Sequence, residues 1–139
     1  MTITFNPYLN FRGNARQAME FYQKVFGGEL NIGTFRDYER TDVPAEVQDQ
    51  VMHARLTAPN GINIMGSDIP ANEDLTIGDN ITLSLTGDDD ATLRGWYEQL
   101  SKSGHATQPL IQASWGDTFG MCVDGFGIMW LFDIAGAQE

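Results

Sequence analysis

Two basic side chains that could do chemistry stand two residues apart, at His53 and Arg55, in the stretch VMHARLTA of residues 51–58. Alternate side chains of a strand share one face, so both would point the same way, together with Thr57. An imidazole, with an unperturbed pKa of about 6.5, can exchange protons or donate a hydrogen bond. A guanidinium can hold a carboxylate or phosphonate through two parallel hydrogen bonds. The pair predicts acid–base chemistry at His53 or anion binding at Arg55.

Both residues also have a structural interpretation. His53 can be a hydrogen-bonded, partly buried residue, and Arg55 can be the ion-pair partner of Glu29, Asp68 or another acid. The chain holds eight lysine and arginine residues against nineteen aspartates and glutamates, with a net charge of -11. An arginine on an inward-facing strand is therefore notable. The same acidity argues against nucleic acid and against an anionic membrane surface as partners, because no basic patch is present to neutralise phosphates.

Three other candidates for chemistry are better explained by structure. His105 follows Gly104 and is predicted to be a solvated residue in a turn. Cys122, the single cysteine, is predicted to be a buried thiol in a strand, with a catalytic nucleophile as the alternative. The triplet Asp88–Asp90 precedes a helical pattern. We expect it to cap that helix rather than to bind a metal, because adjacent residues do not converge on one ion there.

The elements that would position these side chains begin with a strand at residues 3–11, where apolar and polar residues alternate. One face would pack against a helix, and the other, which includes Asn6 and Tyr8, would be wetter. Pro7 cannot donate to a sheet, so we expect this strand to lie at a sheet edge or to contain a bulge.

A helix follows, with Asn14 as its N-cap, Gln17 as the capping-box partner and Gly27–Gly28 as its end. Its spacing predicts one apolar stripe. The stripe consists of Ala15, Ala18, Met19, Tyr22, Val25 and Phe26.

The second half of the chain repeats this plan. A helix after Asp88–Asp90 ends at Gly104, and the turns Pro59–Gly61 and Gly125–Gly127 stand at matching places. Its apolar stripe is Leu93, Trp96, Tyr97 and Leu100. Residues 37–50 are predicted to form a loop. The other strands are predicted at residues 29–36, 51–58, 62–65, 81–86, 119–124 and 128–133. The order β-α-β-β-β in each half predicts an α+β fold of two modules, each with a helix on one face of a small sheet.

The length of 139 residues fits one domain, 1–139, with module one at about 1–68, a linker at about 69–79 and module two at about 80–139. The first residues, MTITFNPYL, lack the basic and apolar regions of a signal peptide, and no apolar run is long enough to span a membrane. We therefore expect a cytoplasmic protein.

Three blocks of this sequence resemble the PhnB-like group of the vicinal oxygen chelate superfamily, which includes glyoxalase I, bleomycin-resistance proteins and extradiol dioxygenases. They are NPYLNFRGNARQAMEFYQKVFGGEL, VMHARLTAPNGINIMGSD and WGDTFGMCVDGFGIMWLFD. The resemblance implies paired βαβββ modules whose curled mixed sheets form a cavity, with the helices on the outer faces, and a homodimer. Some members are labelled demethylubiquinone methyltransferases, but this sequence has no glycine-rich turn after a strand to hold S-adenosylmethionine.

The resemblance also implies where a metal would bind. Metal-dependent members take four ligands, usually His, Glu or Gln, from the first and last strands of the two modules. The corresponding positions here are Asn6 or Tyr8, Met65, Thr82 or Ser84, and Leu131. These are poor ligands for a divalent ion, so we expect no metal cofactor.

Pseudo-symmetry matches Phe119 and Met121 of module two to His53 and Arg55. One wall of the expected cavity would be polar and the other apolar, with aromatic surface added by Phe35, Trp115 and Trp130. The sequence thus favours a metal-free protein that binds a small, anionic or aromatic molecule. The alternatives are a metal-dependent lyase, isomerase or dioxygenase, a metal-free enzyme with His53 as acid or base, and a structural or regulatory dimer.

Overall fold

The computed structural model describes residues 2–40, 42–70 and 72–136, and the chain divides into two compact units, Met1–Thr76 and Ile77–Glu139. The first unit contains β1 (Tyr8–Phe11), α1 (Ala15–Phe26), β2 (Glu29–Thr34), β3 (Val51–Thr57) and β4 (Asn63–Asp68), with short 3-10 turns at Ala45–Val47 and Pro59–Gly61. The second contains β5 (Leu83–Gly87), α2 (Asp90–Ser103), β6 (His105–Gln112), β7 (Thr118–Val123) and β8 (Met129–Ile134).

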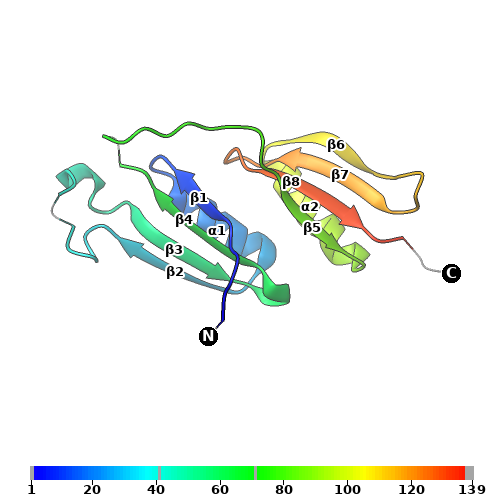
Figure 1. Ribbon diagram of the computed structural model, residues 1–139, viewed down its shortest axis with the longest axis horizontal. Coiled ribbons are helices and arrows are strands. Elements are labelled where there is room, and N and C mark those ends of the chain that lie inside the picture. The colour runs from blue at the N-terminus through cyan, green and yellow to red at the C-terminus, as the bar shows by residue number, and fades with distance from the viewer. Residues whose placement is uncertain (1, 41, 71, 137–139) are drawn as a thin grey trace. The chain divides into compact units, whose positions relative to one another are not determined.

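The two units share one sheet topology (Figure 1). The strand orders are β1-β4-β3-β2 and β5-β8-β7-β6. In each sheet the first strand is parallel to the last, and the remaining pairs are antiparallel. The predicted α+β fold with two βαβββ modules is therefore confirmed. β1 is an edge strand, as Pro7 indicated.

Helix α1 packs against its sheet through the stripe that the sequence predicted. All six stripe residues are buried, and Ala15, Ala18, Met19 and Tyr22 are fully enclosed. Burying a side chain as large as Met19 contributes roughly 1.5–3 kcal/mol. Gly66 of β4 makes room for this contact, because a Cβ there would stand 3.3 Å from the sulfur of Met19. The helix thus covers one face of the sheet and leaves the other face for a site.

The first turn of α1 is held by a residue that the sequence did not indicate. Asn14 occupies the N-cap position but makes no side-chain cap, so the predicted capping box with Gln17 is wrong. Instead Asp68, at the end of β4, accepts a hydrogen bond from the Ala15 N–H at 2.9 Å. Its second oxygen accepts from the Val51 N–H at 3.0 Å. One carboxylate, 2% exposed, therefore fixes the starts of both α1 and β3.

Helix α2 is capped locally, as predicted. Asp89 accepts from both the backbone N–H and the hydroxyl of Thr92. Leu93, Tyr97 and Leu100 are buried, whereas Trp96 is only partly buried.

A glycine follows each helix at a point of close backbone approach. A Cβ on Gly28 would overlap the carbonyl oxygen of Thr57, and one on Gly104 would overlap that of Val123. The two contacts occupy equivalent places in the two units, because Thr57 and Val123 end the equivalent strands β3 and β7. These equivalent backbone contacts agree with the duplication that the sequence pattern indicated.

Three local predictions were wrong. The first strand begins at Tyr8 rather than at residue 3, and Ile3 and Phe5 are 97% and 101% exposed instead of packing against the helix. Strand β2 ends at Thr34 rather than at residue 36. Its register with β3 shifts between Gly33 and Thr34. His105 is exposed, as expected, but it starts β6 instead of lying in a turn.

Among the residues described, no helix has the length and apolar character needed to cross a membrane.

Replacing Asp68 with alanine should destabilise the first unit. The substitution leaves two buried backbone N–H groups, those of Ala15 and Val51, without an acceptor. We expect the free energy of unfolding to fall by roughly 2–4 kcal/mol in urea titrations. Asp74→Ala, an exposed acid of the same unit, is the matched control and should change it by less than about 0.5 kcal/mol. Equal effects of the two substitutions would contradict this role of Asp68.

Candidate functional site

The open face of the first sheet carries a row of four side chains across its strands. Tyr8 of β1 is opposite Met65 of β4, Met65 is opposite Arg55 of β3, and Arg55 is opposite Asn31 of β2. Ala54 and Leu56, which alternate with these residues along β3, are fully buried under α1. Tyr8, Arg55 and Asn31 are exposed, and Met65 is partly buried. The structure therefore brings together three of the predicted site residues and adds Asn31.

His53 lies one step further along β3 on the same face, opposite Gly33 of β2. The Tyr8 ring reaches it: the Tyr8 hydroxyl is 3.4 Å from His53 Nδ1, and the ring centroids are 6.0 Å apart with 30° between the planes. In the tautomer with Nδ1 unprotonated, the hydroxyl donates to Nδ1 and the N–H stays on Nε2. Tyr8 and His53 thus form one aromatic surface over β4, the strand between them.

Arg55 has no ion-pair partner among the described residues. The salt bridges described are those of Arg36 with Asp49, Arg40 with Asp42, and Arg94 with Asp90. The structural interpretation of Arg55 as a partner of Glu29 or Asp68 is therefore wrong for the described part of the chain. Arg55 presents an exposed guanidinium beside Met65 and Asn31.

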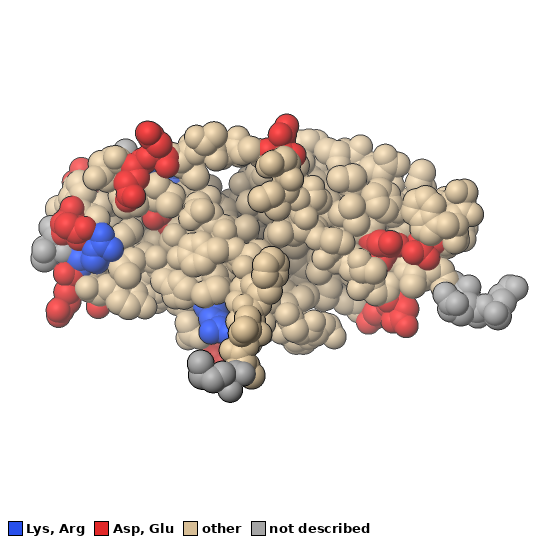
Figure 2. Space-filling model, viewed as in Figure 1, with Lys and Arg blue, Asp and Glu red and all other residues tan. Residues whose placement is uncertain are grey.

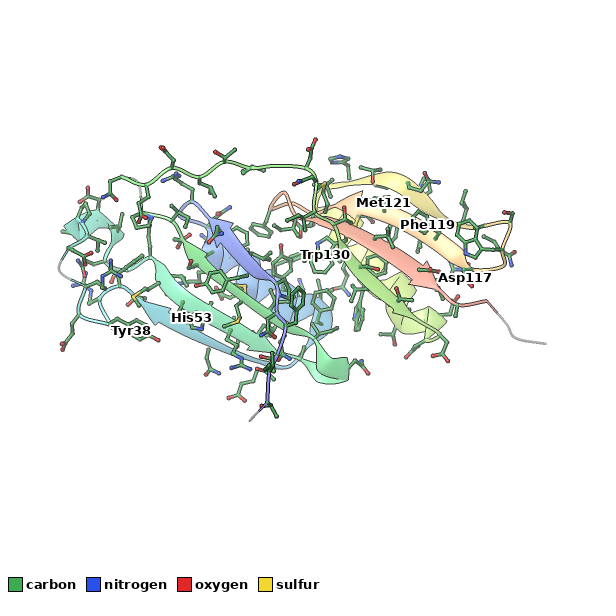
Figure 3. All side chains as sticks on the ribbon, in the orientation of Figure 1. Tyr38, His53, Asp117, Phe119, Met121 and Trp130 are labelled. Carbon is green, nitrogen blue, oxygen red and sulfur yellow. The ribbon has the colours of Figure 1, made fainter. Side chains whose placement is uncertain are left out.

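Tyr38 joins this face although no sequence pattern placed it there. A Cβ built on Gly33 would stand 2.5 Å from Tyr38 Cε2, so the ring lies directly on that glycine. Because Gly33 is opposite His53, the Tyr38 and His53 side chains are neighbours (Figure 3). The available signal was Gly33 itself, since a glycine inside a strand often marks a close approach by another group.

The second unit repeats the row with different chemistry. Ser84 of β5 is opposite Leu131 of β8, Leu131 is opposite Met121 of β7, and Met121 is opposite Gln108 of β6. Phe119 takes the place of His53, one step along β7, as pseudo-symmetry predicted (Figure 3). This face of the sheet is thus largely apolar where the first is basic and aromatic.

The second unit also holds a carboxyl pair that sequence reasoning missed. Asp133 Oδ1 is buried and finds no donor among the described groups, yet its carboxyl lies against that of Asp117. A proton shared between the two carboxyls would supply the missing donor as a hydrogen bond between them. This bond, with burial and the charge of Asp117, raises the pKa of Asp133. The Gly136 N–H donates to Asp117 Oδ1 at 3.0 Å, and this bond together with the shared proton lowers the pKa of Asp117.

The remaining candidates are not members of these cross-strand rows. Asn6 precedes β1, and its amide donates to the Thr4 hydroxyl. Phe35 and Trp130, expected to add aromatic surface, are 3% and 2% exposed and belong to the core. Trp130 donates its indole N–H to Asp124. Trp115 is 65% exposed and meets Phe119 edge to face.

Cys122 is a core residue, as predicted. It is 1% exposed, and burial raises the pKa of its thiol to about 11. A thiol that is neither accessible nor ionised is a poor nucleophile, so the catalytic alternative has no support.

The residues at the superfamily's metal positions do not fit a divalent ion. Within each unit those positions fall on register partners, Tyr8 with Met65 and Ser84 with Leu131. A phenol, a thioether, a hydroxyl and an alkyl group offer no imidazole or carboxylate. Across the described residues, no group of three or more His, Cys, Asp or Glu side chains could hold a metal ion.

Comparison with known proteins identifies the family. The model of a family described as 3-demethylubiquinone-9 3-methyltransferase matches residues 3–132. The chain belongs to this family. Its two βαβββ modules have the fold of a glyoxylase/bleomycin resistance protein/dioxygenase domain.

Solved structures share the fold of this chain. Protein PA1353 from Pseudomonas aeruginosa is 29% identical, with a TM-score of 0.82 over 96% of this chain and 98% of the other. A putative 3-demethylubiquinone-9 3-methyltransferase, PhnB protein, from Bacillus cereus is 24% identical, with a TM-score of 0.76 over 96% and 100%. A glyoxylase/bleomycin resistance protein/dioxygenase domain from Frankia sp. EAN1pec is 17% identical, with a TM-score of 0.66 over 99% of each chain. The last two likenesses show the fold alone.

Substituting Asp133 with asparagine should change how stability depends on pH. Folding raises the pKa of Asp133, so the stability contributed by its protonated form is present in acid and is lost as the pH rises from the unfolded pKa, about 3.9, through the raised folded pKa. The amide introduced by the substitution would donate to Asp117 at any pH. We therefore expect the melting temperature of Asp133→Asn, relative to the unsubstituted protein, to be higher at about pH 7.5 than at about pH 4.

Glu98→Gln is the control for this experiment, because it removes an exposed acid of the same unit. Its melting temperature relative to the unsubstituted protein should stay nearly constant between the two pH values. A pH-independent difference for Asp133→Asn would show that the two carboxyls share no proton.

Proposed function

We propose that the open face of the first unit binds a small anionic or aromatic molecule without a divalent metal, and that the protein acts by sequestering it. The observation that carries this proposal is Arg55, an exposed guanidinium without an acidic partner among the described residues, in a row with Tyr8 and beside His53. A guanidinium in this setting can bind a carboxylate or phosphonate through two hydrogen bonds.

The net charge of -11 does not prevent binding of an anion at this face. Figure 2 shows acidic groups spread over the surface in view, with few basic ones among them. Screening limits their reach, because the Debye length at physiological salt is about 8 Å. At contact distance the Arg55 guanidinium and its hydrogen bonds therefore dominate over acids further away.

The metal-free part of the proposal rests on the donor set. Tyr8, Met65, Ser84 and Leu131 supply neither an imidazole nor a carboxylate, so the proposed binding uses no metal. The single cysteine, with no second thiol for an internal disulfide, is consistent with a protein that works in the cytoplasm.

One observation favours a second function. The contact between the Tyr8 hydroxyl and His53 Nδ1 is compatible with an imidazole that keeps its proton on Nε2. Such a group could transfer a proton to or from a molecule held at Arg55. Turnover of a bound acid, lost in His53→Gln while binding persists, would distinguish this enzyme from a binding protein.

Replacing Arg55 with alanine should weaken binding of simple anions. The probes are benzoate and methylphosphonate, measured by calorimetry and by thermal shift in excess EDTA. We expect at least about a tenfold loss of affinity, because a charge-assisted hydrogen bond contributes about 1.5–3 kcal/mol. Affinity of the unsubstituted protein should be the same with and without EDTA. For the unsubstituted protein, a probe at about 100 times its Kd should add about 2.7 kcal/mol of stability.

Arg16→Ala is the matched control for this loss. Arg16 is exposed on α1, which covers the opposite face of the same sheet. Both substitutions remove one positive charge, but only Arg55→Ala should weaken binding. Equal losses in the two variants, or anion binding that requires a metal, would overturn the proposal.

We further propose that the protein is a homodimer. Each sheet ends in edge strands, and Ile3 and Phe5 are exposed beside β1, so a second copy would cover unpaired backbone and apolar side chains. Light scattering at micromolar concentration should give twice the mass of the chain, and a monomer at that concentration would refute the proposal. Ile3→Ser together with Phe5→Ser should shift the mass toward the monomer.

A further inference from the structure

Tyr38 extends the aromatic surface of the first unit beyond His53. Its ring lies on Gly33 of β2, and Gly33 is opposite His53 of β3. On the other side, Tyr8 of β1 contacts His53 with 30° between the ring planes. Three rings therefore run across the sheet from β1 to β2, next to the row that holds Arg55. Tyr8 and Tyr38 remain 45% and 52% exposed, so part of each side chain is available to a ligand.

The turn that carries Tyr38 is firmly built although it lies in a loop. The Thr34 N–H donates to Asp37 Oδ2 at 2.9 Å, and the Asp37 N–H donates to the Thr34 hydroxyl at 3.1 Å. The Tyr38 N–H donates to the Thr34 carbonyl, and Glu39 takes a positive φ of 55° to close the turn. These reciprocal bonds hold the Tyr38 backbone at the end of β2, so its ring has a defined place on Gly33.

We propose that Tyr38 is the specificity-determining residue of this face and that it selects aromatic carboxylates over aliphatic ones. This inference rests on the proposed function, in which Arg55 binds the anionic group. The carboxylate would sit at Arg55, and the flat ring of the ligand would stack on the exposed part of Tyr38, at the end of the aromatic surface away from Tyr8. A saturated ring of the same size cannot stack in this way, because its faces are not planar.

Gly33 leaves the space in which the Tyr38 ring lies. A Cβ at Gly33 would meet Cε2, the hydroxyl and Cζ of Tyr38 at 2.5, 3.0 and 3.1 Å, and these are its three nearest contacts. The backbone at Gly33 does not need a positive φ. Because those three atoms all belong to one side chain, we expect alanine to displace the Tyr38 side chain and to leave the fold intact. Gly33→Ala thus removes the ring from its place while leaving its chemistry intact.

The experiment compares benzoate with cyclohexanecarboxylate, two acids of equal charge and similar size, in binding to the full chain. The unsubstituted protein should prefer benzoate by about fivefold to tenfold. Tyr38→Ala should reduce this preference to about one by weakening benzoate binding alone, and Tyr38→Phe should retain it. Arg55→Ala, in contrast, should weaken the binding of both acids.

A double-substitution cycle separates the position of Tyr38 from a general effect on folding. Gly33→Ala should lose the benzoate preference as Tyr38→Ala does, and the double variant should lose no more than either single variant. Gly95→Ala is the matched control, because a Cβ at that helical position meets nothing within 4 Å. Its preference for benzoate should equal that of the unsubstituted protein.

The outcomes distinguish the two proposals. If neither acid binds to the unsubstituted protein, the proposed function fails, and this inference fails with it. If both acids bind and Arg55→Ala weakens them, but the benzoate preference survives Tyr38→Ala, the anion site stands and the role of Tyr38 is refuted. Additive losses in the double variant would likewise show that Gly33 acts independently of Tyr38.

Discussion

The buried carboxylate of Asp68 is the interaction on which the first unit depends. It joins the end of β4 to the first turn of α1 and to the start of β3. The chain between β2 and β3 is long, and Val51 is where it returns to the sheet. Because a shift of one residue would turn every side chain of β3 to the other face, this anchor also determines that His53 and Arg55 face away from α1.

The two units have the same strand topology, but the side chains on their open faces differ in chemistry. The register rows correspond strand by strand, yet Phe119 and Met121 stand where the first unit has His53 and Arg55. The cap of α2 comes from Asp89, directly before the helix, whereas that of α1 comes from Asp68, 53 positions along the chain from Ala15. After duplication, the backbone geometry is preserved by close packing at a few glycines, while side chains on the open faces are free to diverge.

Patterns that depend on local spacing were predictable from the sequence. The stripe of α1, both hairpins and the strand parity of His53 and Arg55 follow from helical and strand periods alone. Contacts between distant segments were not. The bond from Asp68 to Ala15 spans 53 positions, Tyr38 reaches the site by a turn within a polar loop, and Asp133 meets Asp117 only after β8 has paired with β7. No short window of sequence contains such partners.

The burial of Cys122 has a practical consequence for the dynamics of the protein. It is the single cysteine, it lies in the second unit, and the neutral thiol cannot react until β7 opens to solvent. A thiol reagent therefore records how often the second unit opens, while the first unit contributes no signal. The natural sequence thus contains its own reporter for comparing the local stability of one unit with the unfolding of the whole chain.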